Sequence, residues 1–425
     1  MWCHICYNAS MDAEIFANGD EITSGKILDT NSQWLSRELA DLGVTPRFHT
    51  AVEDELEDMV DVLRIAMNRV DLIVWTGGLG PTADDLTRQA FADAAGLSLV
   101  EDEASLRQIQ ELFQRRGGTM SPIHRSQAFQ PQGALPIRNP NGTAPGIDLT
   151  VKRKLPIPDG RLDSIRLLAY PGVPAEMMEM WKDSGRRTII KWHEQLEGKK
   201  HIIKSRSIHS FGLCESQVES MLPGLTARDH VPKVGITATQ ATITLRIVAE
   251  GETEEQCDQL IEPTAKLIYE TLGNRIFGEG EDTLPDVVCR IANKQGKSIA
   301  VVEAGTRGLL AEALGRAEAS ATCFLGGIVV PPRQPIAPDK MIEIGRKMFE
   351  ADYLLLIGAY PEGKPERTRS DETFVAVVNA KDSHLQTSLL QMRNYPFVGH
   401  PGIIDDLYIK RALDAFRSLF WAGNG

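Results

Sequence analysis

Apolar and polar positions alternate in a strand–helix order along the first part of the chain. Short apolar runs at 13–17 and 72–75 are typical of buried parallel strands, and a strand is also predicted at 44–52. The helical spacing of apolar residues predicts helices over 30–42 and 56–70. Because such β–α–β units form parallel sheets with helices on both faces, the pattern predicts a three-layer α/β domain.

A glycine-rich loop with the sequence T-G-G-L-G-P follows the central strand at Thr76–Pro81. Thr82 suits a helix N-cap, and Asp84 and Asp85 suit a first helical turn, so a helix is predicted to begin at Thr82. A strand that feeds such a loop and then a helix presents backbone N–H groups to a phosphate, and glycines let that backbone approach closely. The stretch therefore predicts a phosphate site.

Asp84 and Asp85 would repel a phosphate unless a cation lies between the charges. A functional interpretation therefore requires a divalent ion such as Mg²⁺ that bridges carboxylate and phosphate oxygens. The alternative is that Thr82 and Asp85 form only a capping pair at the helix start. Their spacing by itself favours neither interpretation.

Further polar loops follow or precede other predicted strands of the same sheet. The strand at 166–170 leads into Pro171–Met177, the loop Asn139–Gly146 lies before it, and Asn18–Gly25 follows the first strand. Because ligands of such sheets bind at the carboxyl ends of the strands, a composite site is predicted there. No G-x-G-x-x-G motif follows a strand, which argues against a dinucleotide-binding Rossmann domain.

The remainder of the chain predicts two more modules. Residues 198–280 combine a strand, a helix over 211–222, a hairpin centred on Gln240 and a long helix over 253–272, which is an α+β pattern. Residues 283–425 alternate helices and strands again and predict a second α/β domain.

The composition is that of an acidic globular protein, with 425 residues and a net charge of −12. This charge argues against a nucleic-acid-binding surface as the main purpose, so no nucleic-acid partner is expected, whereas phosphorylated metabolites stay open. No apolar run approaches the roughly 20 residues of a membrane span, so no membrane partner is expected. A cytoplasmic location is the simplest expectation, because the first residues lack the pattern of a signal peptide.

Six cysteines are scattered along the chain, and only Cys3 and Cys6 have the spacing of a metal or redox motif. Without a second Cys/His pair, this C-x-x-C is interpreted as incidental. Met11 is a candidate start of the native chain, because the first predicted strand follows it directly.

Five motifs resemble the amino-terminal domain of the CinA (competence/damage-inducible) family. In chain order they are N-G-D-E-I-T-S-G, D-T-N-S-Q-W-L, T-G-G-L-G-P-T-A-D-D-L-T, N-G-T-A-P-G and Y-P-G-V-P-A-E-M, within residues 12–182. The resemblance implies the fold of molybdopterin-binding domains and hydrolysis of ADP-ribose to AMP and ribose 5-phosphate. It also implies a divalent metal, Mg²⁺ or else Co²⁺ or Mn²⁺, a small-molecule nucleotide as substrate, and a homodimer.

Carried onto this sequence, the resemblance implies three kinds of site residue. Asp84 and Asp85 would lie beside the metal, and the catalytic base would be Asp84, Asp85 or Glu21. The phosphate- and substrate-binding residues would be Gly19, Asp20, Asp29, Asn31, Thr76, Gly77, Gly78, Gly80, Thr82, Asn141, Gly146, Gly172, Pro174 and Glu176.

The later modules resemble the later parts of the same family. The connector at 198–280 is similar to a KH-like fold but lacks a basic G-x-x-G loop, so a structural role is favoured over RNA binding. The last domain, 283–425, resembles a nicotinamide mononucleotide deamidase, but the family's E-S-C-T-G-G motif is replaced by E-A-G-T-R-G at Glu303–Gly308. Ala304 stands where the reactive serine is expected, which implies lost deamidation; rescue by Thr306 is the alternative.

Two functions therefore stand against each other. A metal-dependent pyrophosphatase accounts for carboxylates beside a phosphate loop, whereas a non-catalytic regulatory protein that binds a pterin or nucleotide gains nothing from them. Transfer of a nucleotidyl group to a pterin is a third hypothesis.

Overall fold

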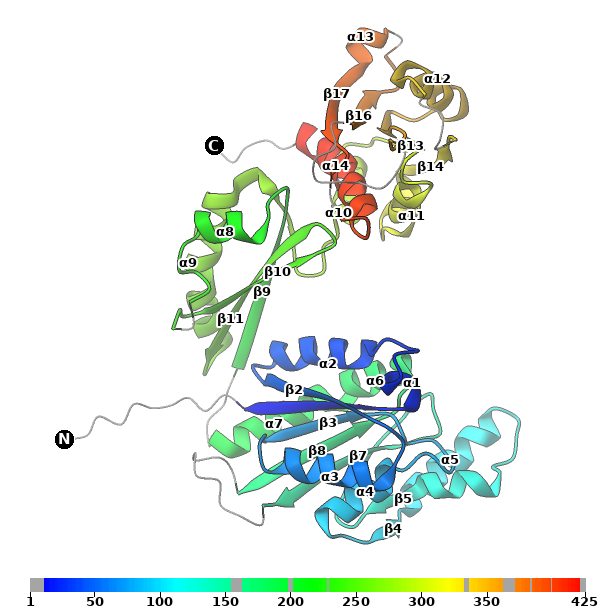
Figure 1. Ribbon diagram of the computed structural model, residues 1–425, viewed down its shortest axis with the longest axis vertical. Helices are drawn as coiled ribbons and strands as arrows, with labels where there is room; N and C mark the ends of the chain where they lie inside the picture. Colours follow the sequence, from blue (N-terminus) through cyan, green and yellow to red (C-terminus); the bar gives the residue numbers. More distant parts are fainter. Residues whose placement is uncertain are drawn as a thin grey trace, which may run out of the picture. The chain divides into compact units, whose positions relative to one another are not determined.

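The chain folds into two compact units (Figure 1). The computed structural model describes residues 11–153, 163–197, 202–227, 229–331, 336–361, 371–382, 384–398 and 400–420. Unit 1 contains Met1–Lys204 with Glu250–Cys257, and unit 2 contains Ser205–Ala249 with Asp258–Gly425. Cys3 and Cys6 lie outside the described residues.

Unit 1 alternates strands and helices, as the sequence pattern predicts. Its strands are β1 (Asp12–Asn18), β2 (Thr45–Val52), β3 (Leu72–Thr76), β4 (Leu99–Glu101), β5 (Phe129–Pro131), β6 (Leu135–Ile137), β7 (Gly146–Lys152) and β8 (Ser164–Tyr170). Its helices are α1 (Asp20–Thr23), α2 (Thr30–Asp41), α3 (Leu56–Met67), α4 (Thr87–Ala95), α5 (Glu103–Arg115), α6 (Pro174–Met180) and α7 (Arg186–Glu197).

The main sheet of unit 1 has the strand order β2-β1-β3-β8-β7-β6. The prediction of a parallel sheet is confirmed for β2, β1, β3 and β8. The sheet is mixed, however, because β7 and β6 extend it in antiparallel fashion. The short strand β6 precedes a segment rich in Gly, Pro and Asn, which gives turn signals rather than strand signals in the sequence.

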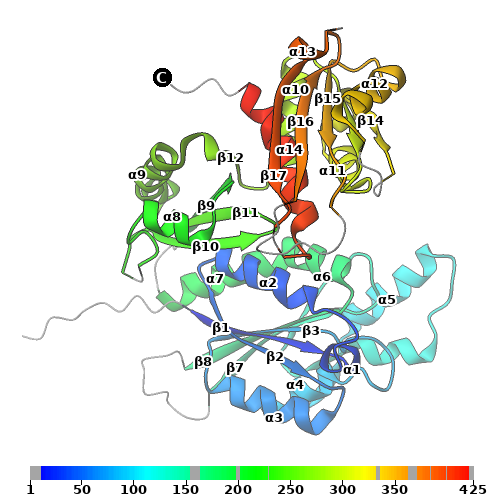
Figure 2. The same cartoon turned by 45° about the horizontal axis from the view of Figure 1, so that its top comes forward.

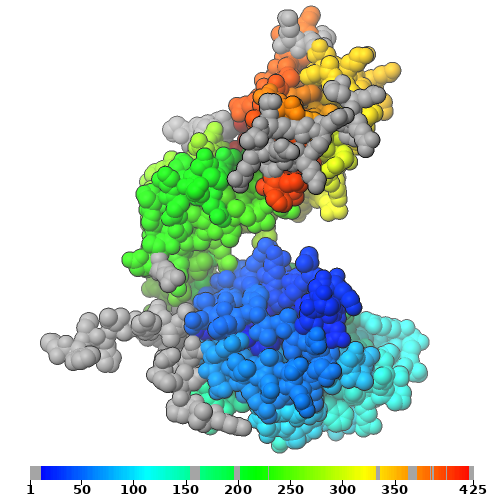
Figure 3. Space-filling model, in the orientation of Figure 1, coloured from blue at the N-terminus to red at the C-terminus, as the bar shows by residue number. Residues whose placement is uncertain are grey.

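Helices cover both faces of this sheet, α2, α6 and α7 on one side and α3 and α4 on the other (Figure 2). Successive strand residues alternate between the two faces of the sheet. Val74 therefore packs on the face covered by α2, α6 and α7, and Trp75 packs on the face covered by α3 and α4. The blue and cyan residues, which include α2, α3 and α5, make up most of the face of unit 1 that the space-filling view shows (Figure 3). Two separate apolar layers therefore fix the central strands in place.

Unit 2 continues from the later part of β9 and contains two sheets. The elements of the connector are β9 (Ile202–Phe211), α8 (Glu215–Met221), β10 (Lys233–Thr239), β11 (Thr242–Gly251), α9 (Glu254–Leu272) and β12 (Ile276–Glu279). The remaining elements are α10 (Leu284–Lys294), β13 (Ile299–Glu303), α11 (Leu309–Arg316), β14 (Phe324–Val329), α12 (Pro338–Met348), β15 (Tyr353–Ile357), β16 (Glu372–Asn379), α13 (Leu385–Ser388), β17 (Leu389–Pro396) and α14 (Ile404–Leu419).

The strand orders of these sheets are β10-β11-β9-β12 and β14-β13-β15-β16-β17. The predicted hairpin is confirmed, with Gln240 and Ala241 both at positive φ in its turn. The predicted helix over 211–222 begins later, at Glu215, because β9 runs to Phe211 and Gly212 has a φ of 85°. Among the described residues, no helix combines the length and the apolar character needed to cross a membrane.

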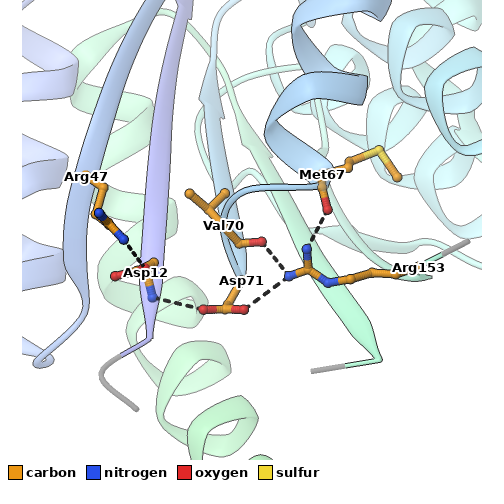
Figure 4. Close-up of polar contacts among 6 residues, drawn as sticks. All are labelled: Asp12, Arg47, Met67, Val70, Asp71 and Arg153. Atoms are coloured by element: carbon orange, nitrogen blue, oxygen red, sulfur yellow. Dashed lines mark hydrogen bonds and ion pairs between the residues drawn. The ribbon is translucent and has the colours of Figure 1, made fainter. Parts of the chain in front are cut away.

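The amino ends of the central strands in unit 1 are tied together by charged side chains (Figure 4). Asp71, just before β3, accepts a hydrogen bond from the Asp12 backbone at 3.1 Å and pairs with Arg153 at 3.1 Å. Arg153 also donates to the carbonyls of Met67 and Val70. Arg47 pairs with Asp12 at 2.9 Å. This network closes the amino edge of the sheet and leaves the carboxyl edge for other groups.

Replacing Arg153 with Met should destabilise unit 1 by about 3 kcal/mol, because it strands the buried Asp71 carboxylate without its cation. The Arg153 side chain is only 3% exposed, whereas that of Arg47 is 50% exposed. Arg47→Met is the matched control and should change the free energy of unfolding by no more than about 0.5 kcal/mol. Urea denaturation measures both values, and equal losses would contradict the assigned importance of the buried pair.

Candidate functional site

The loop after β3 is folded as a hydrogen-bonded turn and not as the start of a helix. The prediction that a helix begins at Thr82 is wrong, because α4 begins at Thr87. The Asp85 carboxylate accepts hydrogen bonds from Gly80 N at 2.7 Å, Thr82 N at 2.9 Å and the Thr82 hydroxyl at 2.5 Å. These bonds compete with helical ones and close the turn over residues 80–85. The predicted Thr82–Asp85 pair therefore exists, but it stabilises a loop.

Four successive carbonyl groups of this loop, from Gly77 to Gly80, accept hydrogen bonds from α4. Gly77 O accepts from the Thr87 hydroxyl at 2.9 Å, and Gly78 O accepts from Thr87 N at 3.2 Å. The two guanidinium ends of Arg88 donate to Leu79 O and Gly80 O. Successive carbonyls are thus held toward the helix.

This arrangement leaves two backbone N–H groups directed away from α4. In a trans peptide the N–H points opposite to the preceding C=O, so the carbonyls of Gly77 and Gly78 set the directions of the Gly78 and Leu79 amides. Neither amide has a hydrogen-bond partner among the described residues. Gly77 and Gly78 have φ values of 107° and 63°, which suit glycine. Adjacent free amides of this kind form an anion-binding nest.

The loop lines a cavity of about 470 Å³ at the carboxyl edge of the sheet. Its walls combine the ends of several elements that are distant in the sequence, as the composite-site prediction requires. Five acidic side chains contribute to the lining. The residues that the sequence predicts and that line this cavity are Gly19, Glu21, Gly77, Gly78, Gly80, Asp84, Asp85, Gly172 and Glu176.

A smaller cavity of about 220 Å³ shares Asn18, Glu21 and Gly172 with the first. Asn31 lines this cavity and donates from Nδ2 to Thr76 Oγ1 at 2.9 Å and to Gly172 O at 2.8 Å. The predicted residues that line this cavity are Glu21, Asp29, Asn31, Thr76, Gly172 and Pro174.

Four predicted site residues line neither cavity. Gly146 opens β7, where an added Cβ would meet the carbonyl of Ala169, so its small size serves strand packing. Asn141 bonds to the side chains of Glu179 and Arg116 on the outside. The remaining two residues are Asp20 and Thr82.

Asp54 is a cavity residue that sequence reasoning missed. It follows β2 and accepts a hydrogen bond from Asn18 Nδ2 at 2.6 Å, while Trp75 Nε1 holds Asn18 Oδ1 at 2.8 Å. Burial raises the pKa of Asp54, and the charges of Asp20 and Asp84 add to this effect. The available signal was its position after β2, at the same edge of the sheet as the other loops.

Asp84 and Asp85 have different surroundings, although they are neighbours in the sequence. Both oxygens of Asp85 are occupied by loop donors. Asp84 is exposed, and hydrogen bonding to Thr82 and to its own backbone lowers its pKa, so it is ionised at neutral pH. Of this pair, Asp84 is the more available to a ligand, because its carboxylate is exposed whereas both oxygens of Asp85 accept hydrogen bonds from the loop.

Comparison with known proteins follows the same division of the chain. Residues 14–191 match the family described as a probable molybdopterin binding domain, and residues 205–278 match the damage-inducible protein CinA KH domain. A putative competence-damage inducible protein of Oceanobacillus iheyensis is 35% identical over 317 residues, covering 75% of this chain and 72% of that protein. The chain belongs to the CinA family. A CinA-like protein of Thermosynechococcus vestitus is 36% identical over 319 residues, covering 75% and 73%.

Solved structures of the CinA family match individual parts of the chain. The protein CinA of Thermoplasma acidophilum, whose function is given as unknown, is 31% identical and covers 42% of this chain and 98% of its own, with a TM-score of 0.36. A competence or damage-inducible protein of Enterobacter asburiae is 18% identical and covers 33% and 99%, with a TM-score of 0.27. The family resemblance of the sequence motifs is confirmed by the two domain matches and by the relatives that cover 75% of the chain.

Residues 303–306 of the E-A-G-T-R-G segment in the carboxyl-terminal domain are buried, whereas Arg307 is exposed. Glu303, at the end of β13, accepts hydrogen bonds from the backbone N–H groups of Leu310 and Ala311 and from the Thr306 hydroxyl. Ala304 is 1% exposed and Thr306 is fully buried. Because the hydroxyl proton of Thr306 is committed to a carboxylate that fastens α11, this side chain serves the local structure.

Substituting Asp85 with Ala should destabilise unit 1 by about 1–2 kcal/mol, since three loop hydrogen bonds lose their acceptor. Asp84→Asn is the matched control on the adjacent exposed residue and should change stability by less than about 0.5 kcal/mol. Thermal and urea unfolding distinguish the two variants. A larger loss for Asp84→Asn would show that the roles of the aspartates are reversed.

Proposed function

We propose that this protein hydrolyses the pyrophosphate bond of ADP-ribose or a related dinucleotide, giving AMP and ribose 5-phosphate from ADP-ribose. The observation that carries the proposal is the pair of free amides at Gly78 and Leu79 on the wall of an acidic cavity. Such amides suit phosphate oxygens, and the cavity of about 470 Å³ lies within the size range of small-molecule sites.

The donor set of the cavity fits a hard divalent cation such as Mg²⁺, Mn²⁺ or Co²⁺. Among the described residues no three His, Cys, Asp or Glu side chains are already gathered as a metal cluster, so the fit rests on donor chemistry. The Asp84 carboxylate is exposed, and Asp54 and Asp84 lie near enough to repel one another, which a cation would relieve. Asp85 is the poorer ligand because its oxygens already accept hydrogen bonds. When bound, the cation would neutralise the charge of the diphosphate.

The chain's own groups account for the remaining requirements of the reaction. The Gly78 and Leu79 amides would hold a phosphoryl oxygen as negative charge develops on it. A water oxygen would form a bond to one phosphorus while the bridging P–O bond breaks, and the departing phosphate would keep the bonding electrons. Glu21 borders both cavities, and it or Asp84 would take the proton from the attacking water.

We infer that the carboxyl-terminal domain keeps its fold without deamidase chemistry. Ala304 has no oxygen to attack an amide, and Thr306 is hydrogen-bonded to Glu303. Assembly as a homodimer belongs to the same proposal and is measurable by sedimentation.

Incubation of the full chain with ADP-ribose and Mg²⁺, Mn²⁺ or Co²⁺ should release AMP, and EDTA should abolish the release. Asp84→Asn should lower kcat/KM by about 10²-fold or more, because it removes a charged ligand from the site. Asp61→Asn, on the exposed face of α3, is the control and should leave the rate unchanged. Chromatographic assay of AMP measures the result.

If ADP-ribose binds but no AMP is released with Mg²⁺, with Mn²⁺ or with Co²⁺, the hydrolase assignment is overturned. That result would favour a non-catalytic nucleotide-binding protein.

Nicotinamide mononucleotide should stay unchanged when incubated with the full chain, because the motif at 303–308 has no free nucleophile. Ammonia release is the measurement, and Thr306→Val is the companion variant. Deamidation that is present in the wild type and lost in Thr306→Val would establish Thr306 as a rescuing nucleophile and contradict the expectation.

A further inference from the structure

The smaller cavity, of about 220 Å³, combines an apolar lining with a buried hydrogen-bond acceptor that is unpaired among the described residues. Two neighbouring aliphatic side chains of this lining are open to solvent, since Ile27 is 58% and Leu28 is 83% exposed. Exposed apolar side chains that gather beside a cavity are typical of a surface that a ligand covers. The apolar residues of the lining are Ala17, Ile22, Ile27, Leu28 and Pro174.

The unpaired acceptor is the side-chain oxygen of Asn31, which is 8% exposed. Asn31 Nδ2 donates to Thr76 Oγ1 at 2.9 Å and to Gly172 O at 2.8 Å. Because Gly172 O can only accept, this contact fixes which end of the amide is the nitrogen, and Oδ1 is left without a hydrogen-bond partner in the described part of the chain. Buried polar atoms are ordinarily hydrogen-bonded, so a donor on a ligand would complete the site.

The other polar side chains of the smaller cavity also favour a ligand that donates hydrogen bonds. Glu21 and Asp29 contribute carboxylates, which accept hydrogen bonds and do not donate them when ionised. The Thr76 hydroxyl already donates to Pro171 O at 3.2 Å. The lining is therefore rich in acceptors, which suits an N–H group and opposes a carbonyl oxygen.

The smaller cavity lies next to the larger one, because Asn18, Glu21 and Gly172 line both. The free amides of Gly78 and Leu79 belong to the lining of the larger cavity. A nucleotide whose phosphate lies against those amides can therefore extend its heterocyclic ring toward the smaller cavity.

We infer that the smaller cavity binds the amino-bearing ring of a nucleotide, with adenine as the ring it accepts. Ile27 and Leu28 pack against the flat ring, and Asn31 Oδ1 accepts a hydrogen bond from the exocyclic amino group. The inference rests on the proposed function for the identity of the whole substrate. It adds to that function a preference for adenine over hypoxanthine, which carries a carbonyl oxygen in place of the amino group.

Calorimetric titration of the full chain in the presence of Mg²⁺ tests the preference for the ring. Wild type should bind AMP at least about tenfold more tightly than IMP, because the carbonyl of IMP would face Asn31 Oδ1 and leave both oxygens unpaired. Ribose 5-phosphate has no ring, so its affinity reports the phosphate site alone.

Ile27→Ser tests the apolar contact, and Ile65→Ser on α3 is its matched control, since the two isoleucines are 58% and 55% exposed. Ile27→Ser should weaken AMP binding by about threefold or more and leave the affinity for ribose 5-phosphate unchanged, because only AMP has a ring to cover. Ile65→Ser should change neither affinity.

Asn31→Ala tests the acceptor and should bring the affinities for AMP and IMP within about twofold of each other. Thermal unfolding checks that this variant is folded, because Asn31 also holds Thr76 and Gly172. If Asn31→Ala does not fold, the comparison of AMP with IMP in the wild type and in Ile27→Ser decides the question.

Equal affinities of the wild type for AMP and IMP would overturn the inference, and so would a failure to bind AMP. Equal losses of AMP and ribose 5-phosphate binding in Ile27→Ser would also overturn it, because they would place Ile27 beside the phosphate. A preference for AMP without any hydrolysis of ADP-ribose would support the inference and refute the proposed function, whereas hydrolysis without the preference would do the reverse.

Discussion

The direction of a few peptide groups after β3 determines what this cavity can bind. Thr87 holds the carbonyls of Gly77 and Gly78 toward α4, so the amides of Gly78 and Leu79, which belong to the same peptide groups, face the other way. The effect does not depend on helix dipole strength, because α4 begins only at Thr87, after the turn closed by Asp85. A loop fixed in this way has its donors preorganised before a ligand arrives, which avoids the cost of ordering them.

The two edges of the main sheet in unit 1 differ in how their charged side chains are paired. At the amino edge, Asp71 and Arg153 are buried and hydrogen-bonded to neighbouring backbone, which favours rigidity. At the carboxyl edge, Asp54 and Asp84 are left with like charges nearby, an arrangement that favours a ligand or a cation. Acidic side chains are paired with an arginine at the amino edge, whereas at the carboxyl edge they lie close to one another. Binding of a cation or ligand is therefore expected to stabilise the fold at the carboxyl edge.

The sequence was informative where one residue type meets one geometric need. The strand at 72–75, the glycines that follow it and the hairpin at Gln240 were predicted because periodicity and positive φ have clear signatures. The start of α4 was predicted wrongly, because Thr82 and Asp85 are equally typical of a helix cap and of a closed turn. The closed turn forms because the Asp85 carboxylate accepts the backbone N–H groups of Gly80 and Thr82, and helix propensity does not distinguish the two structures.

Site residues that act through tertiary contacts had weaker signals. Predicting Asp54 as a cavity residue requires knowing that β2 ends beside β1. The packing role of Gly146 depends on the carbonyl of Ala169 on the neighbouring strand. Arg88 looks like an ordinary helix residue in the sequence, yet it is buried and donates to the carbonyls of Leu79 and Gly80 in the loop. The Asp85 carboxylate is the negative charge that acts on this buried guanidinium, and it also accepts the hydrogen bonds that close the turn over residues 80–85. A contact between a helix residue and a turn residue of this kind has no signature in the local sequence, so only the folded chain shows it.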